Sequence, residues 1–93
     1  MSKFFYVYIL YSHKDHKLYI GVTADLLSRI KDHQLGKVTA TKHRLPIELI
    51  HYEAFRDKGD AKARERYLKS GYGRRNLKRE LLNIFMKMNY IYK

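Results

Sequence analysis

The sequence predicts an α+β domain in which helices pack on a three-stranded sheet. Three runs rich in aromatic and β-branched residues, over 4–11, 17–23 and 46–55, are typical of β-strands. Apolar residues at helical spacing occupy much of the remaining chain. The expected order is β-β-α-β-α-α, and because the chain has 93 residues we expect a single domain over 1–93.

The first half of the chain predicts a hairpin followed by a helix. The polar, turn-like segment 12–16 joins the first two strand-like runs, so we expect them to pair as a β-hairpin. A helix is expected over about 25–35, because Thr23 or Asp25 can cap its N-terminus and Gly36 can end it. A basic, polar loop then leads to the third strand.

The second half of the chain predicts a third strand and two helices. Proline is tolerated at the start of a strand, where Pro46 lies, and the poor alternation of this strand suggests contacts on both faces. The second helix is expected to begin at Asp60, a good N-cap residue, and to stop at Gly71-Tyr72-Gly73. The last helix is expected to carry one apolar stripe, formed by Leu77, Leu81, Ile84, Phe85 and Met88.

The charge balance indicates a polyanionic partner. The chain has 20 Lys and Arg residues against 9 Asp and Glu residues, a formal net charge of +11, which is more than solubility requires. Nucleic acid is the leading expectation, ahead of an anionic membrane surface. The chain contains no cysteine, which excludes disulfides, thiolate metal sites and cysteine-based catalysis.

The longest apolar run, residues 4–11, is too short to span a bilayer. It is followed by the polar residues 13–17 and not by the small-residue cleavage site of a secretory signal. We therefore expect a cytoplasmic protein without a membrane partner.

Glu65 departs from the expected pattern of its helix. It lies at i+4 from Ala61 and three residues before Leu68, so its carboxylate shares a face with apolar side chains. Burying a carboxylate is costly unless a cation or hydrogen-bond donors accompany it. An ion pair with an arginine, or simple exposure, would explain the residue equally well.

Arg29 and His33 are one helical turn apart and project together from the first helix. A guanidinium beside an imidazole can clamp a phosphate, although a solvated helix face is the simpler interpretation. Gly21, in the preceding strand, can permit a close backbone approach or a bulge. Taken singly, Tyr8 and Tyr19 are more typical of half-buried strand aromatics than of catalytic residues.

In combination, these residues resemble the GIY-YIG nuclease family, and the resemblance covers nearly the whole chain. The second motif is intact as Tyr19-Ile20-Gly21, and the first is degenerate as Tyr6-Val7-Tyr8, which lacks the glycine. The helix that follows the hairpin has Arg29 and His33 four residues apart, and Glu65 matches the family's helix glutamate. The short, highly basic chain is most similar to the small stand-alone bacterial branch.

The resemblance implies hydrolysis of phosphodiester bonds with one divalent metal ion, Mg²⁺ or Mn²⁺. Glu65 would bind the metal, and water would fill most of the remaining coordination positions. Arg29 would neutralise the charge that develops on the scissile phosphate. Asn76 is the candidate for the asparagine that often follows the glutamate in this family.

The resemblance also implies roles in proton transfer. Tyr19 is the leading candidate for the general base that activates water, Tyr8 would position it, and His33 would assist. A tyrosine has an unperturbed pKa of about 10, so it needs nearby cations to act near neutral pH. His33 is the alternative base, since an unperturbed histidine has a pKa of about 6.5.

The implied partner is DNA, with RNA as an alternative, and a protein partner could supply targeting. We expect weak sequence specificity or selectivity for DNA structure, with a role in DNA repair or recombination. A catalytically silent nucleic-acid-binding module and a basic RNA-associated structural protein are the competing hypotheses. The expected contacts to the nucleic-acid backbone come from Lys37, Lys42, His43 and Arg44 in the loop and from Arg74, Arg75, Lys78 and Arg79 near the end.

Overall fold

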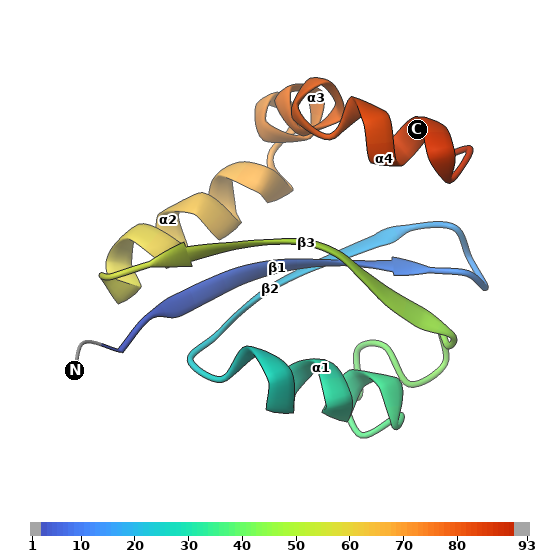
Figure 1. Ribbon diagram of the computed structural model, residues 1–93, viewed down its shortest axis with the longest axis horizontal. Helices are drawn as coiled ribbons and strands as arrows, with labels where there is room; N and C mark the ends of the chain where they lie inside the picture. The colour runs from blue at the N-terminus through green and yellow to red at the C-terminus, as the bar shows by residue number, and fades with distance from the viewer. Residues whose placement is uncertain (1–2, 91–93) are drawn as a thin grey trace.

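A computed structural model of the protein describes residues 3–90, and it confirms an α+β fold built on a three-stranded antiparallel sheet. The elements follow the order β-β-α-β-α-α-α (Figure 1). Their bounds are β1 Phe5–Ser12, β2 Leu18–Thr23, α1 Leu26–Gln34, β3 Ile47–Phe55, α2 Lys58–Lys69, α3 Gly71–Glu80 and α4 Leu82–Lys87.

The sheet is the middle of three layers. Its strand order is β2-β1-β3, so the first strand is central and pairs with both others. Helix α1 covers one face, whereas α2, α3 and α4 lie over the other (Figure 1). As the third strand was expected to do, β3 contacts helices on both sides, α1 and α2.

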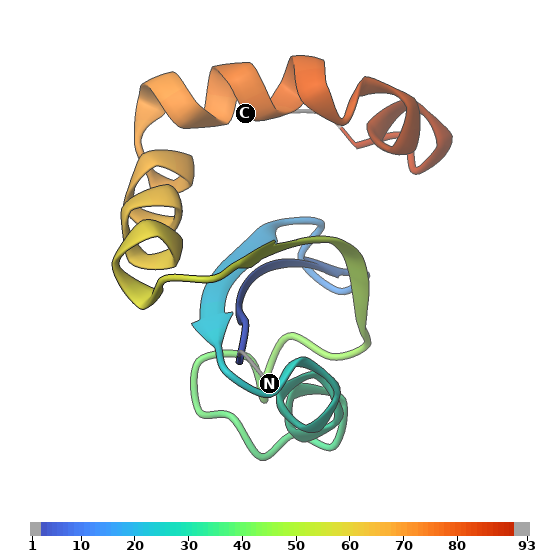
Figure 2. The ribbon, with the colours of Figure 1, turned by 60° about the vertical axis from the view of Figure 1, so that its left-hand side comes forward.

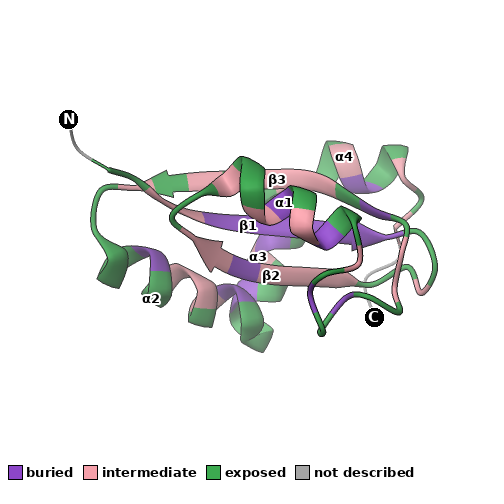
Figure 3. Ribbon diagram, turned by 90° about the horizontal axis from the view of Figure 1, so that it is seen from below, coloured by how far each residue is buried: buried purple, intermediate pink, exposed green. Residues whose placement is uncertain are grey.

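Alternate residues of β1 face different helices, because successive side chains of a strand point to opposite faces. Val7 and Ile9 pack in one buried cluster with side chains of α2, α3 and α4. Tyr8 and Leu10 pack in a second cluster with Ile30 of α1. The strand is therefore almost completely buried along its length (Figure 3), and its even-numbered residues face the α1 side.

The N-caps of α1 and α2 are both aspartates whose side chains accept hydrogen bonds from backbone amides. Of the two expected candidates, Asp25 caps α1, and its side chain accepts a hydrogen bond from the Ser28 amide. The expected cap of α2 at Asp60 was wrong, since Asp57 caps this helix and accepts from the amides of Gly59 and Asp60. Helix α2 therefore begins one turn earlier than expected.

The second helix ends close to where it was expected to stop, since α2 runs to Lys69 and Ser70 is its C-cap. Gly71-Tyr72-Gly73 does not leave the helical conformation, however, because these residues form the first turn of α3. The chain turns instead at Ser70, whose side chain caps α3 by accepting from the Gly73 amide. A Cβ on Gly73 would lie 1.8 Å from the Tyr67 carbonyl oxygen. Gly73 therefore allows α3 to pass close to the end of α2, and it does not end the helix that contains it.

The last helix was expected to be continuous, but it divides at Leu81 into α3 and α4 (Figure 2). Leu81 has φ −111° and ψ 29°, outside the helical range. The bend allows Leu77 of α3 and Phe85 of α4 to reach the same buried cluster. Within the described residues 3–90, no helix has the length and apolar character needed to cross a membrane.

Candidate active site

Two hydrogen bonds join Tyr8, His33 and Thr41 on the α1 side of the sheet. The Tyr8 hydroxyl oxygen lies 3.0 Å from Nε2 of His33, and Nδ1 of the same ring lies 2.7 Å from Oγ1 of Thr41. All three side chains are buried. They come from β1, α1 and the loop after α1, so only the tertiary fold brings them together.

Arg29 completes this group from the preceding turn of α1. Its guanidinium lies beside the Tyr8 hydroxyl, and this neighbour raises the pKa of Arg29. The predicted one-turn pairing of Arg29 and His33 therefore directs both side chains toward the same tyrosine.

Burial and charge move the pKa values of this group away from neutral pH. Burial, reinforced by the Arg29 cation, lowers the pKa of His33 to about 4, so the ring is neutral at pH 7. Burial also raises the pKa of Tyr8, although the neighbouring Arg29 guanidinium acts in the opposite direction. Tyr8 is therefore a neutral phenol beside a neutral imidazole.

Gly21 provides the space that Tyr8 occupies. The two residues are directly opposite each other in the β1–β2 ladder. A Cβ on Gly21 would lie 2.5 Å from the Tyr8 hydroxyl oxygen, closer than real Cβ contacts allow. The interpretation of Gly21 as a site of close approach is thus confirmed, and the approaching group is the tyrosine side chain.

Tyr19 lies beside the same group on β2, an edge strand of the sheet. Its ring centroid is 5.1 Å from that of His33 and 6.3 Å from that of Tyr8. Unlike Tyr8 and His33 it is only half-buried. Tyr19 therefore lies at the edge of the group, partly exposed to solvent, whereas Tyr8 and His33 lie in its buried interior.

Glu65 approaches the group from α2, which contacts both β1 and β2 and runs on the β2 side of the sheet (Figure 2). Its carboxylate is close enough to Tyr8 to help raise the pKa of the phenol. The carboxylate lies 3.2 Å from Nζ of Lys69, one turn further along α2. The carboxylate thus pairs with a lysine, which remains half-exposed, and not with an arginine.

The residues around Glu65 fit a cation held mainly by water and substrate. Within residues 3–90, no group of three or more His, Cys, Asp and Glu side chains is arranged to hold a metal ion. Mg²⁺ often binds through one or two carboxylates, substrate phosphates and several waters. Glu65 could supply that single carboxylate, and Lys69 is exposed enough to move aside.

Asn76 lies apart from this group, on the other side of the sheet. Its amide nitrogen donates to the Tyr67 hydroxyl of α2, and Tyr67 packs against the cluster formed by Val7 and Ile9. The bond joins α3 to α2, so it has a clear structural effect. The catalytic role of Asn76 stays a prediction.

The basic residues predicted to contact nucleic acid fall into two regions. Lys37, Lys42 and His43 are exposed in the loop after α1, whereas the Arg44 guanidinium already binds Asp15, with Nε 2.5 Å from a carboxylate oxygen. That ion pair fixes the loop to the β1–β2 hairpin. The second region is the exposed surface of α3, which carries Arg74, Arg75, Lys78 and Arg79.

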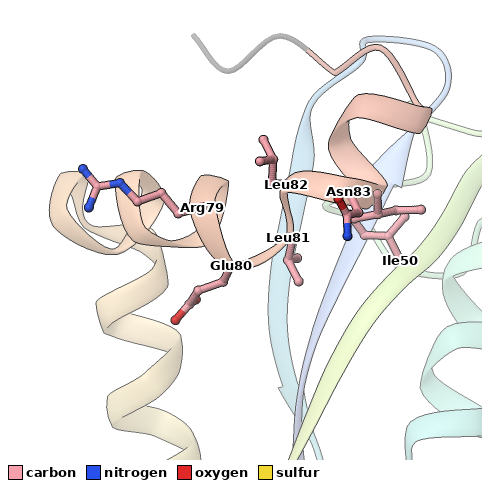
Figure 4. Close-up of a pocket in the computed structure, with 7 residues that line it drawn as sticks. Ile50, Arg79, Glu80, Leu81, Leu82 and Asn83 are labelled. Atoms are coloured by element: carbon pink, nitrogen blue, oxygen red, sulfur yellow. The ribbon is translucent and has the colours of Figure 1, made fainter.

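A shallow hollow at the α3–α4 junction lies on the opposite side of the sheet from His33 (Figure 4). Ile50 and Leu81 line it together with Arg79 and Glu80. None of the tyrosines or histidines of the Tyr8 group lines it, so it is separate from the candidate site.

Thr41 is the member of the group that sequence reasoning missed. It lies in a polar loop segment, Thr39-Ala40-Thr41-Lys42, where nothing in the local pattern distinguishes it from the exposed Thr39. Only its complete burial and its bond to His33 single it out. One sequence therefore holds a matched pair of threonines, one inside the site and one outside.

Comparison with known proteins identifies the family. Residues 4–79 match the family described as the GIY-YIG catalytic domain. A UPF0213 protein of Haloquadratum walsbyi is 37% identical over 71 residues, covering 75% of this chain and 79% of the relative. A UPF0213 protein of Clostridium perfringens is 45% identical over 65 residues, covering 69% of each chain.

A further UPF0213 protein, from Staphylococcus haemolyticus, is 39% identical over 74 residues, covering 78% of this chain and 89% of the relative. No solved structure matches the chain. The relatives come from both bacteria and archaea, and their shared region includes most of the fold. The chain therefore belongs to the GIY-YIG family of nuclease domains.

Proposed function

We propose that the protein is a divalent-metal-dependent endonuclease that hydrolyses DNA phosphodiester bonds. The observation that carries the proposal is the buried hydrogen bond between Tyr8 and His33 beside the Arg29 guanidinium. A neutral imidazole at the end of a phenol can accept a proton, and the adjacent cation can offset negative charge on the phenol or on a phosphate.

The arrangement supports a proton relay through Tyr8. A water molecule gives a proton to the Tyr8 oxygen while the hydroxyl proton of Tyr8 passes to Nε2 of His33. The water oxygen then bonds to phosphorus, the bond from phosphorus to the 3′ oxygen breaks, and the 3′ oxygen takes a proton from solvent. His33 afterwards returns its proton to solvent by the reverse path through Tyr8. Because one proton enters Tyr8 as another leaves, no free phenolate forms at Tyr8. The cost falls instead on His33, whose lowered pKa makes its protonated form short-lived.

In this relay Tyr8, and not Tyr19, takes the proton from water. The sequence favoured Tyr19 as the base and gave Tyr8 a positioning role. Tyr8, however, is the tyrosine whose hydroxyl bonds His33 and lies beside the Arg29 cation. Tyr19, half-buried at the edge of the group, is better suited to hold the attacking water or the substrate phosphate.

The proposed metal ion, Mg²⁺ or Mn²⁺, would bind at Glu65. When bound, it supplies positive charge to the scissile phosphate and the leaving oxygen. A single carboxylate gives a weak site, so we expect appreciable metal affinity only with nucleic acid present.

Binding of the nucleic-acid backbone follows from charge. The net charge of +11 and the exposed cations of the loop and α3 supply sequence-independent attraction. We propose structure-selective or weakly specific recognition, a role in DNA repair or recombination in the cytoplasm, and a protein partner for targeting. RNA is the alternative substrate.

Cleavage assays on branched, nicked, flapped and single-stranded DNA, and on RNA, test the proposal with Mg²⁺, Mn²⁺ or EDTA. Glu65→Ala and Arg29→Ala should each lower metal-dependent cleavage about 100-fold or more. Glu48→Ala, which removes an exposed carboxylate of β3, is the matched control and should cleave normally.

Affinity measured by fluorescence anisotropy separates binding from chemistry. All four proteins should bind DNA, and their affinity should fall steeply with salt. Binding without cleavage of any substrate by the wild type would identify a catalytically silent nucleic-acid-binding module. Equal cleavage by wild type and both site variants would exclude this site.

A further inference from the structure

We propose that Thr41 is a positioning residue that fixes the proton of His33 on Nδ1 and so leaves Nε2 free to accept from Tyr8. The inference rests on the proposed function for its catalytic consequence. Its structural part concerns a hydrogen-bond direction, which can be measured without substrate or metal.

The direction of the bonds follows from which groups can donate. The Arg29 guanidinium carries only donors, so its position beside Tyr8 favours an arrangement in which the lone pairs of the Tyr8 oxygen face the cation. The hydroxyl proton of Tyr8 is then available for Nε2 of His33, 3.0 Å away. A neutral ring that accepts at Nε2 carries its proton on Nδ1, which donates to Oγ1 of Thr41 over 2.7 Å.

The opposite tautomer would use the site poorly. Nε2 would then donate to Tyr8, so the Tyr8 oxygen would face two donors, the His33 ring and the neighbouring Arg29 cation, and could not give its proton to His33. In the first arrangement Tyr8 turns its lone pairs to the cation and its proton to the His33 ring.

The loop holds Thr41 rigidly in place. Its amide donates to the Val38 carbonyl at 3.1 Å, and its own carbonyl accepts from the Arg44 amide at 2.8 Å. The Val38 side chain is buried beneath the loop, and Arg44 is tied to Asp15. A hydroxyl mounted on so constrained a turn can orient an imidazole, as outer-shell partners of functional histidines do.

Of the groups around His33, the charged ones do not supply the hydrogen bond that Thr41 makes to Nδ1. On α1, the Arg29 cation opposes a charge on the ring and the Asp32 carboxylate favours it. Across the sheet layer, Tyr8 and Tyr19 face the ring, and Glu65 of α2 acts on Tyr8. When Tyr8 donates to Nε2 the ring proton lies on Nδ1, and the Thr41 hydroxyl is the group placed to accept it there.

Nitrogen-15 NMR of the histidine rings, recorded near pH 7 without nucleic acid or metal, tests the proposal directly. The His33 ring is assigned by its loss in His33→Gln. We expect Nδ1 to be protonated and Nε2 unprotonated in the wild type and in Thr41→Ser. In Thr41→Val the population should shift toward the Nε2-protonated form.

Cleavage measurements then test the catalytic consequence. Thr41→Val should lower kcat about 10-fold to 100-fold with KM for DNA unchanged, and Thr41→Ser should recover most of it. Thr39→Val, the exposed threonine two residues earlier, is the control and should match the wild type.

The outcomes separate the two proposals. Protonation of Nε2 in the wild type, or an unchanged tautomer in Thr41→Val, would overturn the role of Thr41 even if the protein cleaves DNA. The expected tautomer shift in a protein that cleaves no substrate would support the positioning role and reject the nuclease. A normal kcat in Thr41→Val despite a shifted tautomer would overturn the catalytic consequence.

Discussion

Two tyrosine–histidine hydrogen bonds extend from the same strand, and they differ in almost everything else. Tyr8 bonds His33, 25 residues away, and the pair is buried. Tyr11 bonds Nδ1 of His16, five residues away, over 2.8 Å at the tip of the β1–β2 hairpin. His16 is exposed, whereas His33 is completely buried.

The surroundings give the two bonds different chemistry. The Tyr8 pair has Arg29 on one side, and its histidine pKa is lowered to about 4. Tyr11 instead packs edge-on against the rings of His13 and Tyr90. A tyrosine–histidine hydrogen bond is therefore present in both regions. The candidate active site differs because its histidine is completely buried and the Arg29 cation lies beside its tyrosine.

The largest expected contrast is in catalysis. Tyr8→Phe should reduce DNA cleavage about 100-fold to 10,000-fold, because it removes the hydroxyl through which the proton passes. Tyr11→Phe removes the equivalent hydroxyl at the hairpin tip and should leave cleavage within about twofold. Single-turnover cleavage rates measure both, with circular dichroism as the control for folding. Similar losses in both variants would remove the distinction between the two pairs.

A smaller effect is expected in the dependence of stability on pH. The pKa of His33 is about 4 in the folded protein and about 6.5 when unfolded, so the unfolded chain binds the extra proton between these values. The free energy of unfolding should therefore fall by about 3 kcal/mol as pH drops from about 6.5 to 4.

His33→Gln should lack this part of the pH dependence. Urea unfolding curves at several pH values provide the measurement. The lowered pKa values of Asp15 and Glu53 act at the acid end of this window and below it, and they contribute equally to both proteins. An identical slope in wild type and His33→Gln would show that His33 is not held neutral by its site.

The two tyrosines also differ in the β2 residue that lies opposite each of them. Tyr8 is paired with Gly21, whereas Tyr11 is paired with Leu18, so only the first tyrosine requires an absent side chain across the ladder. Gly21→Ala should displace the Tyr8 ring and cost about 1–3 kcal/mol of stability. Thermal unfolding and cleavage should both be affected, and normal values for both would show that Tyr8 can shift without consequence.

The smallest effect is expected at the hairpin tip. His16 has φ 60°, a left-handed conformation that asparagine tolerates well. His16→Asn loses the bond to Tyr11 and should cost about 0.5–1.5 kcal/mol, with cleavage unchanged. Chemical denaturation gives the stability change, and a marked fall in cleavage would show that the tip takes part in the reaction.

Most of the fold could be predicted because its signals are local. The strands are rich in aromatic and β-branched residues, and Asp25 is a good cap for α1. The errors fell where local signals compete. Asp57 and Asp60 are both good N-caps, and Gly73 is a helix breaker in isolation but a crossing point against Tyr67 in the fold.

The candidate site could be predicted only in part. Arg29 and His33 were found because one helical turn separates them, and Gly21 because a strand glycine is unusual. Thr41 could not be found, since its loop sequence matches that of the exposed Thr39. The Lys69 partner of Glu65 also became clear only from the structure.

The sequence by itself determined the charge, the order of the elements and the family. Strand alternation also places Tyr8 and Tyr11 on opposite faces of the sheet, but the face that α1 covers is known only from the structure. Only the tertiary structure decided that His33 is neutral, that Tyr8 bonds it and that Tyr11 has a different environment. Those properties depend on desolvation and on the position of the Arg29 cation, which arise when segments far apart in the chain pack together.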